Sequence, residues 1–232
     1  MKIRIKFAKY GVMKFIGHLD TMRFFQKAVR RAEIDVKYSE GFSPHQIMSF
    51  AAPLGVGIES FGEYMDIELC SMTSPEDIMH ALNQVMVDGI EILSVTVLPD
   101  HAKNAMASVA AASYRLCMKE GGFPVDDLAG KIRDFYEQDT IPYTRETKKS
   151  VIELDLKQGI YEIDADSDGT IRMLVNASSS GNIKPSMVFE KFCLFAGVEI
   201  PSSACQVVRL ETYADLAGEG AVHRFVPLSE MC

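Results

Sequence analysis

The hydrophobic and polar positions of the chain change period several times, which predicts alternating strands and helices. Residues 2–8 alternate charged and apolar side chains, as a strand does, and a helix is expected from about His18 to Glu33. Ser74 and Pro75 begin a second helix, which ends near Asp88. Further strands are expected at 36–38, 47–52, 63–70 and 90–98. This β-α-β-β-α-β order predicts a ferredoxin-like unit.

The second half of the chain repeats this order with an extra hairpin. Strands are expected at 109–119, 160–164, 171–176 and 205–213, helices at 124–136 and 185–195, and hairpin strands near 140–145 and 150–156. We therefore predict an α+β protein of two tandem ferredoxin-like units with antiparallel sheets. The units are expected at residues 1–98 and 109–232, with a linker at 99–108.

Composition excludes several classes of protein. No run of about 18 apolar residues is present, so no membrane span is expected. The first eleven residues lack an apolar signal segment, which favours a cytoplasmic protein. The five cysteines are odd in number and far apart, as reduced thiols are. Without a CxxC or CxxxCxxC spacing, neither a cysteine-ligated metal nor an iron–sulfur cofactor is expected.

Charge is distributed unevenly along the chain. The overall net charge is −8, but residues 1–50 hold ten lysines and arginines against four acids, a net charge of +6. A basic segment on an acidic body favours one surface for an anionic partner. The alternative is that these charges only form a solvated face.

The first helix separates its apolar and charged side chains at 100° per residue. Leu19, Met22, Phe25, Val29 and Ala32 are expected on the buried face, and Asp20, Arg23, Lys27, Arg30 and Arg31 on the opposite one. Phe24 lies beside Lys27 and Arg31, where an aromatic ring could stack on a base. The alternative is that Phe24 closes the edge of the core.

Two loops after this helix carry unusual side chains. The first, SEGFSPH (39–45), combines turn-forming residues with Phe42 and His45, which could instead be a core plug and a partner of a backbone carbonyl. The second, PLGVGIES (53–60), could hold an anion on its backbone amides, although it is not a Walker sequence. We expect residues 9–60 to form the working surface. The candidate binding residues are Tyr10, His18, Asp20, Arg23, Lys27, Arg30, Arg31, Ser39, Glu40, Gly41, Phe42, Pro44, His45, Gly55, Gly57, Glu59 and Ser60.

Catalysis could involve only a few side chains. His18, at the start of the first helix, and His45 could act as a general acid–base pair if folding brings them together, whereas Asp20 fits a helix-stabilising role better. Each histidine could equally be structural. No GxSxG, HExxH or carboxylate cluster with metal spacing is present.

The segment FIGHLDTMRFFQKAVRRAEIDVKYSEGFSPHQIMSFAAPLGVGIESFGEYMDIEL closely resembles the bacterial radical-SAM-linked proteins, a family with a domain of unknown function. Small departures from that pattern are Gly17 for Ser, Gln26-Lys27 for Arg-Ala, Ser43 for Asn and Gln46 for Pro. The resemblance implies a partner radical S-adenosylmethionine enzyme and, by association, a role in RNA modification or handling. A more distant likeness, in architecture alone, is to the CRISPR RAMP endoribonucleases.

Three hypotheses follow. The first, which we favour, is a non-catalytic accessory module that presents RNA or another anionic substrate to a radical SAM enzyme. The second is a metal-independent endoribonuclease that uses His18 or His45. The third is a pure protein–protein adaptor that docks through the SEGFSPH loop.

Overall fold

The computed structural model describes residues 1–146, 151–217 and 221–231, and the chain forms two compact units. Unit 1 contains residues 1–110 and 211–232, and unit 2 contains residues 111–210. Strand β10 (Cys205–Asp215) passes from unit 2 into unit 1. The tail therefore belongs to unit 1, whereas the sequence pattern assigned every residue after 109 to the second unit.

Unit 1 has the ferredoxin-like order of elements. They are β1 (Lys2–Lys9), α1 (His18–Arg31), β2 (Met48–Phe50), β3 (Glu59–Glu68), α2 (Pro75–Asn83) and β4 (Ile90–Leu98). The sheet order is β4-β1-β3, and short β2 pairs with β3. All these pairs are antiparallel, with Ile5 of β1 opposite both Met65 and Val95. The predicted α+β class is confirmed.

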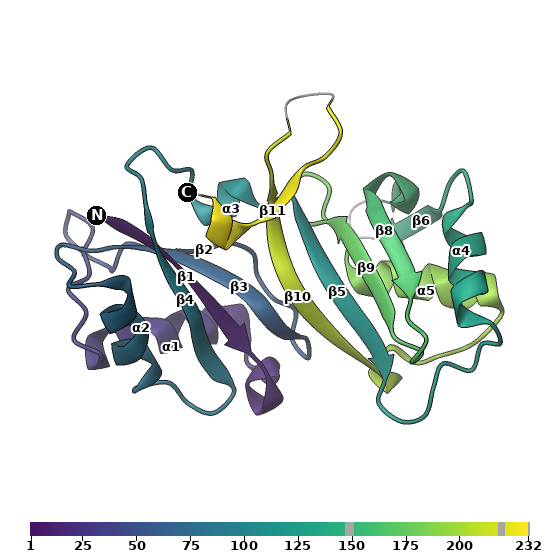
Figure 1. Ribbon diagram of the computed structural model, residues 1–232, viewed down its shortest axis with the longest axis horizontal. Coiled ribbons are helices and arrows are strands. Elements are labelled where there is room, and N and C mark those ends of the chain that lie inside the picture. Colours follow the sequence, from purple (N-terminus) through teal and green to yellow (C-terminus); the bar gives the residue numbers. More distant parts are fainter. Residues whose placement is uncertain (147–150, 218–220, 232) are drawn as a thin grey trace. The chain divides into compact units, whose positions relative to one another are not determined.

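Unit 2 repeats the arrangement. Its elements are β5 (Ala111–Met118), α4 (Leu128–Tyr136), β8 (Ile160–Ala165), β9 (Ile171–Asn176), α5 (Pro185–Ala196) and the first half of β10, and its sheet order is β10-β5-β9-β8. Strands β6 (Pro142–Glu146) and β7 (Val151–Asp155) form a separate antiparallel hairpin, as expected. Figure 1 shows these elements along the chain.

Several helix boundaries follow from local capping. The Ser74 hydroxyl accepts a hydrogen bond from Asp77 N at 3.0 Å, which confirms the expected start of α2, although the helix ends at Asn83. Helix α4 begins at Leu128 and not at residue 124, because Asp127 adopts a positive φ of 49° and its carboxylate caps Gly130 N. The short elements are η1 (Gly11–Phe15), α3 (Ala105–Ser108), η2 (Leu156–Gly159), η3 (Ser202–Ala204), β11 (Phe225–Pro227) and η4 (Leu228–Glu230).

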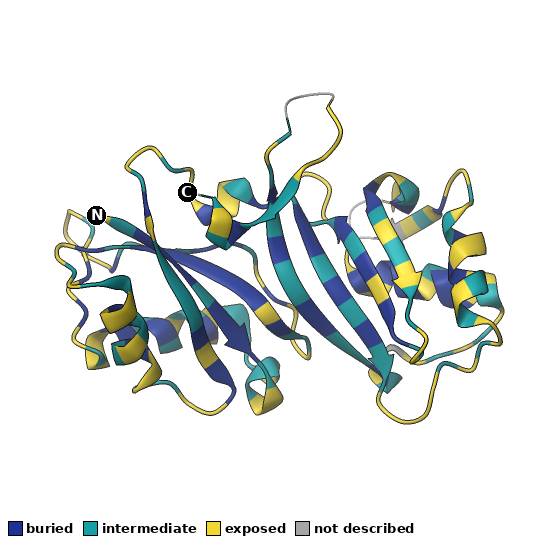
Figure 2. Cartoon of the chain, in the orientation of Figure 1, coloured by how far each residue is buried: buried dark blue, intermediate teal, exposed yellow. Residues whose placement is uncertain are grey.

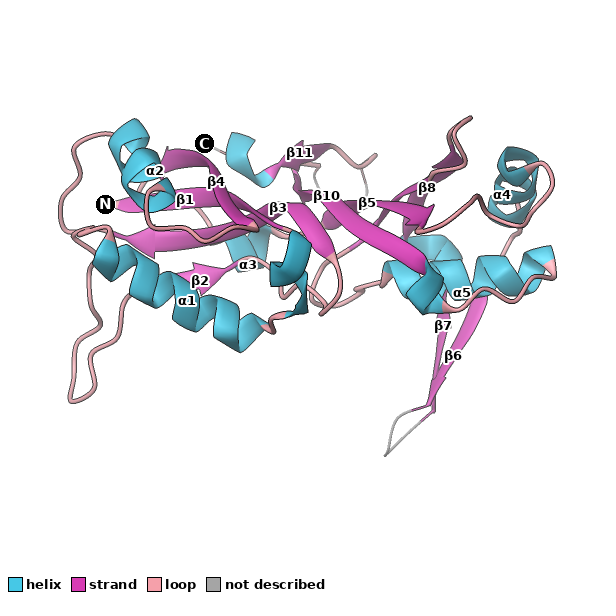
Figure 3. Cartoon of the chain, turned by 90° about the horizontal axis from the view of Figure 1, so that it is seen from below, coloured by secondary structure: helices cyan, strands magenta, loops and turns pink. Residues whose placement is uncertain are grey.

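The hydrophobic core of unit 1 lies between one face of its sheet and the two helices. Alternation in β1 directs Ile3, Ile5 and Phe7 to this face, where they pack with side chains of α1 and α2 such as Phe25 and Leu82. Figure 2 shows β1 as almost entirely buried, and Figure 3 shows both helices beside the strands. No helix in the described part of the chain is long and apolar enough to cross a membrane.

The opposite face of the same sheet holds a buried ion pair. Arg4 donates from Nε and Nη2 to the Asp66 carboxylate at 2.8 and 3.1 Å, and each side chain is 1% exposed. Asp66 also accepts a hydrogen bond from Ala105 N, and Arg4 donates to the carbonyls of Lys103 and Leu228. The expected linker and the C-terminal tail are thus bound to the sheet of unit 1.

Replacement of Asp66 by alanine should strongly destabilise the protein, because Arg4 would remain buried without a counter-charge. We expect a loss of about 3–5 kcal/mol in the free energy of unfolding, measured by urea denaturation. The matched control is Asp166→Ala, which removes the half-exposed Asp166–Arg172 pair and should cost less than about 1 kcal/mol. Equal losses in the two variants would contradict a structural role for the buried pair.

Candidate functional site

The outer face of α1 carries four exposed cations, as predicted: Arg23, Lys27, Arg30 and Arg31. Arg23 pairs with Asp20 of the first turn at 3.3 Å, and within the described residues this is the only carboxylate contact of the four. Arg31 donates instead to the Val85 carbonyl. Most of this positive charge is therefore available to an anion.

The inner face of α1 differs from the prediction at its first turn. Leu19 is 66% exposed, not buried, whereas Thr21 is 4% exposed and its hydroxyl donates to the Gly17 carbonyl. At 100° per residue, Leu19 lies about 120° around the helix from Phe25 and Thr21 only about 40° from it, so Thr21 and not Leu19 faces the core. Phe24 does close the core edge, and the Arg31 guanidinium lies 5.8 Å from its ring centre.

The SEGFSPH loop is a closed turn that exposes its aromatic side chain. Ser39 N donates to the His45 carbonyl, His45 N donates to the Ser39 hydroxyl, and that hydroxyl lies 2.9 Å from His45 Nδ1. Gly41 has a φ of 109°, a conformation that favours glycine. Phe42 at the tip is fully exposed, with 111% relative exposure, so it is not a core plug.

The base of this loop adjoins the cationic face of α1. The Gln46 side chain donates to the Gln26 carbonyl at 3.2 Å, and Arg30 Nε donates to the same oxygen at 3.3 Å. Tyr38, which pairs with Gln46 across the loop, is 46% exposed and was not recognised from the sequence. The loop and the cations thus share one surface, which we call the loop–helix surface: Arg23, Lys27, Arg30, Tyr38 and residues 39–46.

The PLGVGIES loop lies elsewhere in unit 1. Gly57 N donates to the Lys14 carbonyl of η1, and Glu59 pairs with the Lys14 ammonium at 2.9 Å. η1 follows the end of β1. The SEGFSPH loop lies near the start of β1, because Lys37 N donates to the carbonyl of Glu68, which is opposite Lys2. At ~3.3 Å per residue, the two ends are about 20 Å apart. The expected working surface therefore divides into two regions.

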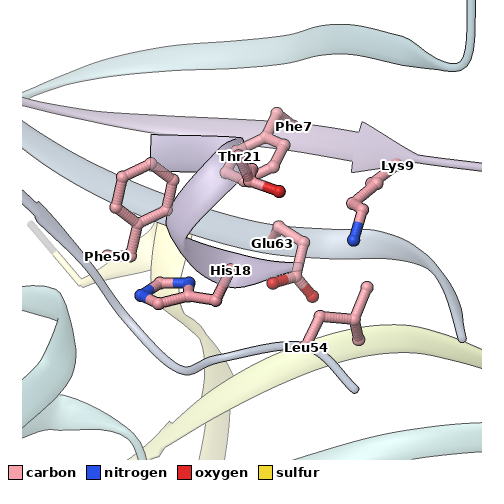
Figure 4. Close-up of a pocket in the computed structure, with 7 residues that line it drawn as sticks. All are labelled: Phe7, Lys9, His18, Thr21, Phe50, Leu54 and Glu63. Carbon is pink, nitrogen blue, oxygen red and sulfur yellow. The ribbon is translucent and has the colours of Figure 1, made fainter. Parts of the chain in front are cut away.

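A small cavity lies beneath the first turn of α1, near η1. Its lining includes Lys9, His18, Thr21 and Glu63 together with Phe7, Phe50 and Leu54, as Figure 4 shows. Its volume of about 10 Å³ is close to the least that holds one water molecule. Lys9 is 2% exposed and donates to the Ile16 carbonyl, so it fixes the chain where α1 begins.

Electrostatics couple the ionisable side chains of this cavity. Burial lowers the pKa of the Lys9 ammonium, and the Glu63 carboxylate acts in the opposite direction. Glu63 accepts a hydrogen bond of 2.6 Å from Ser60, which is fully buried and so does not offer its side chain to an external anion. Neither Lys9 nor Glu63 was predicted as a site residue. Lys9 nevertheless alternates in phase with Ile5 and Phe7, whose side chains face the core.

The two candidate catalytic histidines lie in different regions. The His18 ring lines the cavity and contacts Phe50 edge-on, with 5.5 Å between ring centres. His45 is held by Ser39 within the SEGFSPH loop, near the other end of β1. The structure therefore gives no shared site for the acid–base pair.

Tyr10, another predicted binding residue, stacks on Phe61 beside η1 and also lies away from the loop–helix surface.

Replacement of Lys9 by methionine should destabilise unit 1, because it removes the ammonium that interacts with Glu63 and the bond to Ile16. We expect a loss of about 3 kcal/mol in the free energy of unfolding, measured by urea denaturation. The control, Lys27→Met on the exposed face of α1, should change it by less than about 0.5 kcal/mol. If Lys9→Met leaves the free energy of unfolding unchanged, the contacts of Lys9 with Glu63 and Ile16 do not fix the start of α1.

Comparison with known proteins gives a weak structural similarity and one sequence family. A chain of the solved structure described as "Crystal Structure of a Cbf5-Nop10-Gar1 Complex" is similar with a TM-score of 0.46 and 9% identity, over 90% of this chain and 48% of that chain. This chain thus spans about half of that chain's length. No curated protein matches the sequence. Residues 2–185 match the family described as "Uncharacterized protein conserved in bacteria (DUF2344)", and the chain therefore belongs to this bacterial family.

Proposed function

We propose that this protein is a non-catalytic accessory module that works with a radical SAM enzyme and presents RNA or another anionic substrate to it. The observation that carries the proposal is the exposed cationic face of α1, beside the SEGFSPH loop. Three of its cations, Lys27, Arg30 and Arg31, make no carboxylate contact within the described residues.

The spacing of these cations suits a polyanion. Lys27 and Arg31 are one helical turn apart, as are Arg23 and Lys27, so the side chains form a row along the exposed face. Lysine and arginine bind phosphate groups by charge-assisted hydrogen bonds. A row of several cations binds a chain of phosphates better than it binds a single small anion, because each contact releases counterions. RNA is therefore the favoured ligand.

The partner enzyme is inferred from the sequence resemblance, and a second surface of unit 1 suits it. Three exposed apolar side chains lie at η1 and the PLGVGIES loop: Val12, Phe15 and Val56, which are 64–73% exposed. The Gly57–Lys14 bond holds the loop next to η1, which carries both Val12 and Phe15. Apolar side chains grouped on a surface are typical of protein-binding sites. The loop–helix surface would then remain free for RNA.

The double variant Lys27→Gln/Arg30→Gln should weaken binding of a fluorescently labelled RNA at moderate salt. Each lost phosphate contact should reduce the slope of log affinity against log salt by about 0.7–0.9. The matched control is Lys131→Gln/Arg133→Gln on the exposed face of α4, which removes the same charges from unit 2. Equal effects of the two pairs, or RNA affinity that does not change with salt, would refute the RNA proposal.

The double variant Val12→Ser/Phe15→Ser should reduce co-purification of the radical SAM enzyme, because it makes the apolar surface polar. RNA affinity should not change, since neither side chain belongs to the loop–helix surface. Co-expression of both proteins, with capture through a tag on this chain, measures the association. Val222→Ser, a change at a more exposed apolar residue away from η1, is the control. If the enzyme is retained at wild-type levels, this surface is not its docking site.

A further inference from the structure

The geometry of the SEGFSPH loop points to the form of nucleic acid that the protein binds. We propose that the ligand is single-stranded RNA, with bases stacked on Phe42 and Tyr38 while Arg30 and Lys27 hold the phosphates. This inference rests on the proposed function, since it specifies the RNA presented there. It assigns a binding role to two aromatic side chains that do not contribute to the core of unit 1.

Phe42 and Tyr38 are two exposed aromatic side chains carried by a hydrogen-bonded loop. Phe42 is fully exposed at the tip of the loop, and Tyr38 is 46% exposed near its base. Three contacts between Ser39 and His45 close the loop, and the Tyr38–Gln46 bridge continues the pairing toward unit 1. The aromatic rings are thus presented on a preorganised turn, which lowers the entropy lost on binding.

The nearest cations are connected to this loop through one carbonyl group. Gln46 and Arg30 both donate to the Gln26 oxygen, at 3.2 and 3.3 Å, so Arg30 lies at the loop base. Lys27 follows Gln26 directly on α1. An aromatic side chain beside a row of cations is the usual arrangement for single strands, because the rings stack on the bases while the cations follow the backbone.

A duplex cannot use the same arrangement. Its bases are already stacked on one another, so exposed rings gain little from it.

The loop also carries one acidic side chain, Glu40, which is exposed and repels phosphate. If the strand passes over the loop, Glu40→Gln should raise the affinity. If only α1 contacts the RNA, that change should have little effect.

Fluorescence provides a direct test, because the chain contains no tryptophan. Phe42→Trp introduces a single reporter that remains able to stack, and titration with a single-stranded RNA of about ten nucleotides should quench it. Phe15→Trp places a matched, exposed reporter at η1 and should show no quenching. A duplex of the same sequence should leave both reporters unchanged.

Affinity measurements complete the test. Phe42→Ala should weaken binding of the single strand roughly 5- to 150-fold, the range expected for one lost base stack. Phe42→Tyr should restore it, and duplex affinity should be unaffected by either change.

Several outcomes would overturn the inference. If RNA binding depends on Lys27 and Arg30 but not on Phe42, the proposed function stands and the stacking role is wrong. If Phe42→Ala abolishes co-purification of the enzyme and leaves RNA affinity unchanged, Phe42 is a protein anchor. If neither the cations nor Phe42 affects RNA, both proposals fail.

Discussion

The buried contact between Arg4 and Asp66 holds together segments of unit 1 that are far apart in sequence. One guanidinium group bonds the carboxylate of β3, the carbonyl of Lys103 and the carbonyl of Leu228. A buried arginine is tolerated only where its donors find partners, so these segments must meet at this point. The tail consequently completes the polar face of the unit 1 sheet, where Lys6 and Tyr64 also bond to Glu211.

Because the polar face is occupied in this way, the helix-covered side and the ends of β1 remain for external ligands. Two regions lie about 20 Å apart along that strand. One is the loop–helix surface, which is cationic and aromatic. The other surrounds η1 and is apolar, above a cavity whose Lys9 and Glu63 are both more than 90% buried. Under the proposed function, a polyanion on the loop–helix surface would leave the apolar side chains at η1 open to a protein partner.

The sequence predicts those features that depend on local periodicity. The start of α1 near His18 follows from the hydrophobic period, and the start of α2 follows from the cap at Ser74. The burial of Lys9 does not, because it depends on the turn after η1, where the Ile16 carbonyl accepts a hydrogen bond from the Lys9 ammonium. The place of the tail is also non-local, since it requires Arg4 to meet Leu228 across 224 positions. The separation of His18 from His45 is also non-local, because it depends on how the chain between α1 and the SEGFSPH loop folds.

The exposure of Phe42 has an energetic consequence. Its ring is as exposed in the folded protein as in an extended chain, so it contributes no hydrophobic stabilisation to the fold. The turn that carries it still loses conformational entropy, and the Ser39–His45 contacts offset part of that loss. A loop selected only for stability would carry a polar side chain at this position. An aromatic ring held on an ordered turn gains hydrophobic stabilisation only when a partner covers it, and for this reason we propose a binding role for the loop.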